Sequence, residues 1–177
     1  MRRYSAFGKK ERDMIYQLTD LFTLFYLRFV KDYNGRDEHH WSNIMESASV
    51  TAWKGYAFEQ VCFLHLNQIK KALGINGIQS DVCSWMYRGE EGRAQIDMVI
   101  DRNDQTINLC EMKYSATPYT IKKDYDQWLL ERRELFREQT HTRKALHLTM
   151  VTTFGLKENP YSGDINSAVT LADLMKE

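Results

Sequence analysis

The sequence predicts an α/β fold in which helices cover the faces of a mixed β-sheet. Three segments, 13–31, 49–73 and 121–139, place apolar residues at the three-four spacing of an amphipathic helix. Strand-type runs, alternating or rich in β-branched residues, lie between and after these helices, at 78–87, 94–101, 106–114 and 145–154. Strands and helices in this order build one sheet with helices on its faces.

The first predicted helix, 13–31, is rich in Phe and Tyr. Its apolar stretch is interrupted by Gln17, Asp20 and Arg28, which the centre of a bilayer would penalise, so we expect no membrane partner. An apolar helix of this kind needs a protein surface to cover it, either a second copy in a homodimer or a different partner.

The polar run 31–40 contains the turn signal Asn34-Gly35 and marks the expected edge of a domain. We therefore expect a helical extension over 1–40 and the main domain over 41–177.

The second predicted helix, 49–73, ends near Gly74, a helix stop signal. The periodicity then changes to that of strands, beginning with 78–87. The two alternating runs that follow are joined by the polar segment 102–105, which predicts a β-hairpin.

Pro118 breaks the chain after the hairpin, and Thr120 precedes the charged helix 121–139. A strand and a last short helix over 170–175 complete the domain. The crossover from the hairpin through the charged helix to the next strand is expected to be right-handed.

The composition is that of a soluble globular protein, with 177 residues, 43% hydrophobic and 27% charged. Its 24 Lys and Arg balance 24 Asp and Glu, so any contact with nucleic acid requires a local basic face. An odd number of widely spaced cysteines indicates reduced thiols and a cytoplasmic location. These cysteines are Cys62, Cys83 and Cys110.

Two carboxylates and a lysine are concentrated on the predicted hairpin. Glu111 and Lys113 are two residues apart in a strand and therefore share a face. If the hairpin turns around 103–105, Asp97 lies opposite Glu111 on that same face, whereas a slip of one residue would separate them.

Paired carboxylate oxygens suit Mg²⁺ or Mn²⁺, which could activate a water molecule and neutralise charge on a phosphodiester. Lys113 could hold the attacking water or a phosphate oxygen. The alternative is that Asp97, Glu111 and Lys113 form ordinary solvated cross-strand pairs.

The hairpin pattern, with QIDMVID followed by CEMKY, resembles the PD-(D/E)XK nuclease superfamily, the restriction-endonuclease-like fold. The resemblance spans about 53–154 and implies that Asp97 and Glu111 bind the metal and that Lys113 is catalytic. Glu59, in KGYAFEQVC, fits the helical glutamate that often completes or supports this metal site. Ile96 replaces the proline that usually precedes the first acid.

The segments WKGYAFEQVCFLH, INLCEMKYS and LTMVTTFGLKENPYSG are similar to the C-terminal nuclease-like region of a group of bacterial and archaeal AAA+-type ATPases. In those proteins this region follows an ATPase and a winged-helix segment. The sequence has no G-x-x-x-x-G-K-[ST] motif, so we expect no ATP binding by this chain alone. The resemblance implies a C-terminal fragment or a stand-alone relic, with an ATPase domain or ATPase partner.

The best candidates for phosphate contacts lie on the charged helix: Lys122, Lys123, Arg132 and Arg133. Acidic residues alternate with them, so the sequence favours a solvated helix of mixed charge over a dedicated DNA-binding surface. The expected function is Mg²⁺- or Mn²⁺-dependent hydrolysis of phosphodiester bonds, of DNA. The alternative is a catalytically inactive module that binds DNA or regulates an ATPase.

Overall fold

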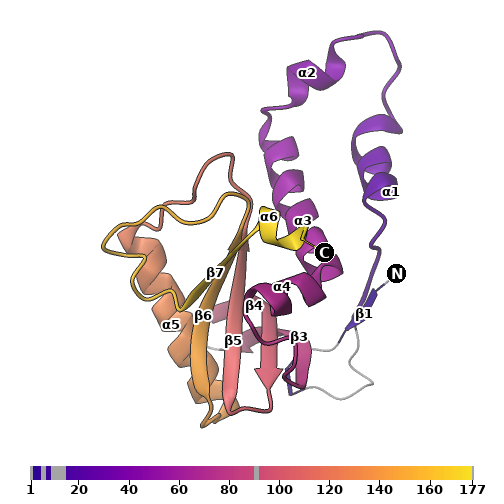
Figure 1. Cartoon of the computed structure of the whole chain (residues 1–177). Coiled ribbons are helices and arrows are strands. Elements are labelled where there is room, and N and C mark those ends of the chain that lie inside the picture. The colour runs from indigo at the N-terminus through magenta and orange to yellow at the C-terminus, as the bar shows by residue number, and fades with distance from the viewer. Residues whose placement is uncertain (1, 5–6, 9–14, 90–91, 177) are drawn as a thin grey trace.

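A five-stranded sheet forms the centre of the protein, and helices pack against both of its faces (Figure 1). The computed structural model describes residues 2–4, 7–8, 15–89 and 92–176. The sheet has the order β3-β4-β5-β6-β7. Its strands are β3 (Ser80–Gly89), β4 (Gly92–Arg102), β5 (Thr106–Lys113), β6 (Ala145–Thr152) and β7 (Ser167–Thr170). Because β3, β4 and β5 are antiparallel while β6 and β7 run parallel to β5, the sheet is mixed, and the predicted α/β class is confirmed.

Helix α5 (Lys123–Thr140) covers one face of the sheet. Its buried Leu129 and Phe136 pack against Ile96, Val99 and Leu109 of β4 and β5. The helix also connects β5 to the parallel strand β6, a connection that needs a crossover rather than a tight turn. The apolar stripe predicted for this helix therefore faces the core.

Helices α3 (Ala48–Leu64), α4 (Leu66–Ala72) and α6 (Leu171–Leu174) cover the other face (Figure 1). Phe58, Cys62 and Ile69 pack there against β4 and β5. The single helix predicted over 49–73 is interrupted at His65, whose φ of −105° and ψ of 32° leave the helical region. Gly74, with φ of 69°, ends α4 as predicted.

The predicted helix over 13–31 is wrong in its first half. Residues Ile15–Gln17 form β2, which pairs with β1 (Arg2–Tyr4), and residues 13–14 lie outside the described part of the chain. Helix α1 (Leu21–Phe25) begins only after Asp20, whose carboxylate accepts the backbone N–H of Phe22. A side chain that caps a helix N-terminus cannot lie in a helix interior, which explains the late start. The helix then continues as a π-helical turn, η2 (Tyr26–Val30).

The segment that contains α1, η2 and α2 (His40–Ile44) projects with the start of α3 beyond the sheet (Figure 1). Phe25 and Phe29 contact Trp41 and Trp53 there, with ring centroids 5.0 to 6.0 Å apart. Of the fourteen exposed large hydrophobic side chains in the described part of the chain, eight belong to this segment and the residues before it: Tyr16, Leu18, Phe22, Tyr26, Leu27, Val30, Trp41 and Met45. We call this segment the N-terminal arm. The boundary expected between residues 40 and 41 falls inside α2 and stays a prediction.

Candidate functional site

The β4–β5 hairpin has the predicted register, with Met98 opposite Cys110. The backbone pairing between the two strands ends at this pair. Beyond it, β5 is hydrogen-bonded to the Asp97 side chain instead of to the β4 backbone. The Met112 N–H donates a hydrogen bond to Asp97 Oδ2 at 3.2 Å. The Asp97 carboxylate is therefore hydrogen-bonded to β5 at Met112, the residue between Glu111 and Lys113.

A β-bulge lies at Asp97. Cys83 and Trp85 of β3 are separated by one residue, whereas their partners Val99 and Ile96 are separated by two, one of which is Asp97. As a result Ile96 and Val99 pack into the same core cluster on the α5 side. Bulges redirect side chains and are common next to active sites, and this one separates Asp97 from the regular alternation of β4.

Glu111 and Lys113 share the face of β5 that α5 covers, as their spacing predicts. Lys113 Nζ lies 2.8 Å from Glu111 Oε1, and the Tyr125 hydroxyl of α5 donates to the same oxygen at 3.2 Å. Glu111 is only 7% exposed. The contact is thus a buried carboxylate with a partly buried ammonium, not a solvated cross-strand pair.

Glu59 of α3 lies close enough to Asp97, Glu111 and Lys113 for their charges to affect its pKa. Burial, followed by the charge of Asp97, raises the pKa of Glu59 to about 7, against the opposing effect of Lys113. Burial also raises the pKa of Asp97 and of Glu111. The structure therefore places Asp97, Glu111 and Lys113 together on β4 and β5, with Glu59 of α3 within reach of their charges.

Three acidic side chains share this partly buried region with one lysine, an arrangement that favours an additional cation. No group of three or more His, Cys, Asp or Glu side chains is placed to hold a metal ion within residues 2–4, 7–8, 15–89 and 92–176. Mg²⁺ usually takes only one or two protein carboxylates together with water and phosphate oxygens. Asp97 and Glu111 fit such a donor set because both are carboxylates and they lie on adjacent strands.

Helix α5 adds residues whose role the sequence did not indicate. Helix periodicity places Tyr125 and Trp128 in the apolar stripe of this helix, and in the structure the Tyr125 hydroxyl reaches Glu111. Burial raises the pKa of Tyr119, which precedes the helix, while Lys113 lowers it and Glu111 raises it further. An aromatic residue on an apolar helix face has the same periodicity whether it fills a core or orients a carboxylate, so the sequence could not separate these roles.

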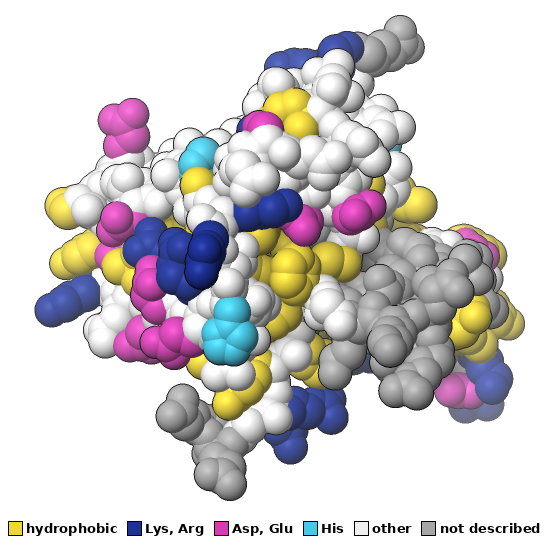
Figure 2. Space-filling model, turned by 90° about the horizontal axis from the view of Figure 1, so that it is seen from below, with side chains coloured by type: hydrophobic (Ala, Val, Ile, Leu, Met, Phe, Trp, Pro, Cys, Tyr) yellow, Lys and Arg dark blue, Asp and Glu magenta, His cyan; other side chains and the backbone are white. Residues whose placement is uncertain are grey.

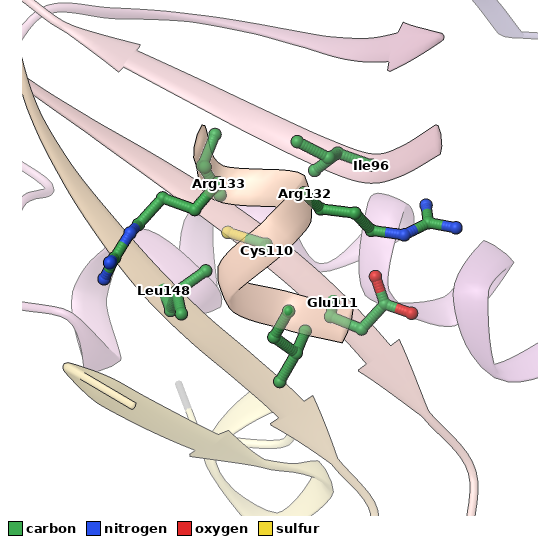
Figure 3. A pocket seen from close by; sticks show the side chains of 8 residues that line it. Ile96, Cys110, Glu111, Arg132, Arg133 and Leu148 are labelled. Atoms are coloured by element: carbon green, nitrogen blue, oxygen red, sulfur yellow. The ribbon is translucent and has the colours of Figure 1, made fainter. Parts of the chain in front are cut away.

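Arg132, one of the predicted phosphate-binding residues, lies within electrostatic reach of the acids. Its guanidinium is 3.5 Å from the centre of the Trp128 ring. Burial lowers the pKa of Arg132, and the charges of Glu111 and Asp97 oppose this effect. A small pocket between α5 and the sheet is lined by Glu111, Arg132 and Arg133 (Figure 3). The Glu111 carboxylate points towards the Arg132 side of this pocket, whereas Arg133 extends to the opposite side.

The remaining basic candidates are arranged differently. Arg133 pairs with Glu134 at 2.9 Å, and Lys122 and Lys123 are exposed at the start of α5, within one turn of Tyr125. Figure 2 shows positive and negative side chains side by side on the lower face of the molecule, not one continuous positive surface. On α5 itself, Arg133 and Arg137 both pair with Glu134, in agreement with the mixed charge expected for this helix.

The raised pKa of Glu59 makes the stability of the metal-free protein depend on pH. Its ordinary value is 4.5 and its folded value about 7, so the stabilisation is complete below pH 4.5 and is lost as the pH rises through 7. We expect a loss of about 1–2 kcal/mol across this window, after discounting for partial exposure to solvent. Urea unfolding in EDTA at several pH values measures it, and Glu59→Gln should flatten the profile. An equally steep profile in Glu59→Gln would contradict the assignment.

Residues 26–129, more than half of the chain, match the family DUF234, described as archaeal and bacterial proteins of unknown function. The matched range contains Glu59, Asp97, Glu111 and Lys113. A comparison with curated proteins gives no significant match. The crystal structure of the protein of unknown function AF1548 is similar to 62% of this chain, with 14% identity and a TM-score of 0.43. The aligned region spans 56% of that protein. Among the described residues, no helix has the length and apolar character needed to cross a membrane.

Proposed function

Since the chain belongs to the DUF234 family, whose description states no activity, we propose its function from its own site: a metal-dependent nuclease-like domain that hydrolyses phosphodiester bonds of DNA. The observation that carries this proposal is the group of Asp97, Glu111 and Lys113 beside a bulge in β4, with Glu59 of α3 coupled to their charges. The order acid, then Glu-x-Lys, on two adjacent strands supports the resemblance to the PD-(D/E)XK superfamily.

Asp97 and Glu111 would hold Mg²⁺ or Mn²⁺ through carboxylate oxygens, with Glu59 assisting from α3. The metal would lower the pKa of a bound water and neutralise charge on the phosphodiester. Lys113 presents an ammonium beside Glu111, where it can orient a water molecule or stabilise charge on a phosphate oxygen. The apolar walls of Ile96, Leu109 and Leu129 would limit the access of bulk water.

DNA would approach along the exposed start of α5. Arg132 supplies a guanidinium beside the acids, and Lys122 and Lys123 extend the positive charge to the helix N-terminus. The neutral net charge gives no long-range attraction to DNA, so this local group would have to provide it.

The N-terminal arm favours a second role, attachment to a partner protein. Its exposed Phe22, Tyr26 and Val30 lie four residues apart and form one apolar stripe. An ATPase domain or ATPase partner would cover this stripe and deliver the nuclease-like domain to its substrate. If cleavage is absent, the same surface supports the alternative of a non-catalytic partner-interaction module.

The deciding experiment is a plasmid-nicking assay with Mg²⁺, with Mn²⁺ and with EDTA, run beside calorimetry of Mn²⁺ binding. We expect Mn²⁺ binding and metal-dependent nicking in the wild type, and neither in Asp97→Asn. Folded wild-type protein that binds no metal would exclude the catalytic assignment. Metal binding without cleavage of DNA or RNA would favour the non-catalytic module.

Lys122 and Lys123 provide a separate prediction for DNA binding. We expect the double variant Lys122→Ser, Lys123→Gln to bind DNA more weakly and to lower the slope of log affinity against log salt by about 1 for each phosphate that the protein no longer neutralises. Serine at the N-cap position should also preserve α5. Fluorescence anisotropy in EDTA at several salt concentrations measures the slope. The control is Lys31→Ser, Lys176→Gln, and an unchanged slope in the test variant would place the DNA elsewhere.

A further inference from the structure

Three side chains on one face of α5 form a continuous stack. The Tyr125 and Trp128 rings lie 5.1 Å apart with an interplanar angle of 19°. The Arg132 guanidinium lies over the Trp128 ring, 3.5 Å from its centre. Spacings of three and four residues place the three side chains on the same side of a helix. We call this set the α5 stack.

The two ends of the α5 stack hydrogen-bond to the two strands that carry the acids. Tyr125 donates its hydroxyl to Glu111 Oε1 of β5, and Arg132 donates to the backbone carbonyl of Gln95 in β4. Gln95 precedes Asp97 by two residues, next to the bulge. One helix face therefore holds both strands at the positions where they present their carboxylates.

Glu111 has its two oxygens in different situations. Oε1 receives the Tyr125 hydroxyl and the Lys113 ammonium, whereas no hydrogen bond to Oε2 is found in the described part of the chain. Lys113 is also 5.4 Å from the centre of the Tyr125 ring, so the tyrosine contacts both members of the pair. This geometry fixes the carboxylate through one oxygen and leaves the other available as a ligand.

Tyr125 is suited to a permanent donor role. A phenol has an ordinary pKa of about 10, so it carries its proton near neutral pH and can donate to Glu111 Oε1. Its ring is fixed by Trp128 on one side and by the edge contact with Tyr119 at 5.7 Å. A phenol hydroxyl whose ring is held in place can keep a carboxylate in one orientation.

We propose that the α5 stack is a positioning device for the metal site: Tyr125 orients Glu111, and Arg132 anchors β4 beside Asp97. The inference rests on the proposed function in one respect, because the carboxylates are taken as metal ligands. Tyr125 would act on the metal only through Glu111, to which it is hydrogen-bonded, so it is a positioning residue.

Tyr125→Phe tests the first half, because it keeps the ring and removes only the hydroxyl. We expect Mn²⁺ affinity to fall by about tenfold, as for other groups that orient metal ligands. The kcat for nicking should fall while KM stays unchanged, and the midpoint of thermal unfolding should remain near that of the wild type. The matched control is Tyr119→Phe, which removes a neighbouring hydroxyl that is not bonded to Glu111. Wild-type Mn²⁺ affinity in Tyr125→Phe would overturn this half.

Arg132→Lys tests the second half, the anchoring of β4, in metal-free protein. Lysine keeps the positive charge but loses the planar stacking on Trp128 and the fork of hydrogen-bond donors. We expect hydrogen–deuterium exchange of the amides over 93–98 to become about tenfold faster than in the wild type. The control is Arg133→Lys on the neighbouring position, which should leave these amides unchanged. Unchanged exchange in Arg132→Lys would overturn the anchoring role.

The two measurements separate the possible failures. A wild type that binds no Mn²⁺ would overturn the proposed function and the orientation of a metal ligand by Tyr125, and the exchange experiment would still decide the anchoring by Arg132. If the wild type binds Mn²⁺ and Tyr125→Phe binds it equally well, the positioning role of Tyr125 is overturned, but the proposed function is not.

Discussion

Glu111→Gln is expected to abolish Mn²⁺ binding and to reduce plasmid nicking by about a thousandfold. The amide has the size of the carboxylate and can still accept hydrogen bonds from Tyr125 and Lys113, but it lacks the charge that a hard cation requires. A metal contributes several kcal/mol of transition-state stabilisation, and about 4 kcal/mol corresponds to about a thousandfold in rate. Calorimetry and a time course of nicking measure the two effects in the same preparation.

The same substitution should leave the fold intact. Burial, followed by the charge of Asp97, raises the pKa of Glu111, which means that the folded protein disfavours the charged form of this side chain. A neutral amide removes that cost, while Lys113 remains about one-third exposed and can be solvated. We expect an unfolding midpoint equal to or above that of the wild type. Glu138→Gln, an exposed position on α5, is the matched control.

Retained metal binding in folded Glu111→Gln would contradict the assignment. Asp97→Asn provides a second variant if Glu111→Gln does not fold, because asparagine keeps an acceptor for the Met112 N–H. Loss of binding in both variants, with circular dichroism like that of the wild type, would support a site formed by the two strands together.

The periodic elements of the fold could be predicted because local pattern and tertiary packing agree. The apolar residues that alternate along β4 and β5, and those of the α5 stripe, are buried in the two core clusters. The pattern that burial imposes is therefore present in the sequence. Residues 15–17 and strand β7 were misjudged because this agreement fails there. Residues 15–17 are short enough to fit either periodicity, and only pairing with β1 decides for a strand. Strand β7 has four residues and was not predicted, because a single buried residue in it, Val169, leaves no recognisable alternation.

The part of the candidate site that could be predicted is the part that follows from strand geometry and hairpin register. Glu111 and Lys113 share a face by strand geometry alone, and the hairpin register brings Asp97 beside them. The bulge at Asp97 could not be predicted, since it depends on pairing with β3, a strand whose register the sequence does not specify. Tyr125 was missed because its hydroxyl acts through a tertiary contact that helix periodicity does not encode.

Lys113→Met is expected to separate cleavage from metal binding. Methionine keeps much of the length of lysine and loses the ammonium, so Glu111 Oε1 loses one of its two partners. Mn²⁺ affinity should be retained or increased, because the metal no longer competes with a cation for Glu111. Nicking should fall by about 100- to 1000-fold, the usual loss when one group that stabilises developing charge is removed. The control is Lys31→Met, an exposed position at the end of η2 and outside the proposed DNA-binding surface.

Lys113→Met that loses Mn²⁺ binding together with cleavage would assign Lys113 a structural role instead. The variant Lys113→Arg then tests which chemistry the lysine performs. Burial disfavours the ammonium, but Glu111 and Asp97 outweigh this effect and raise the pKa of Lys113, so it acts as a cation in the metal-free site. A divalent cation on the same carboxylates would push that pKa in the opposite direction. If Lys113 serves as a cation, Lys113→Arg should retain part of the activity that Lys113→Met loses, whereas a proton acceptor could not be replaced by arginine, which stays charged at every working pH.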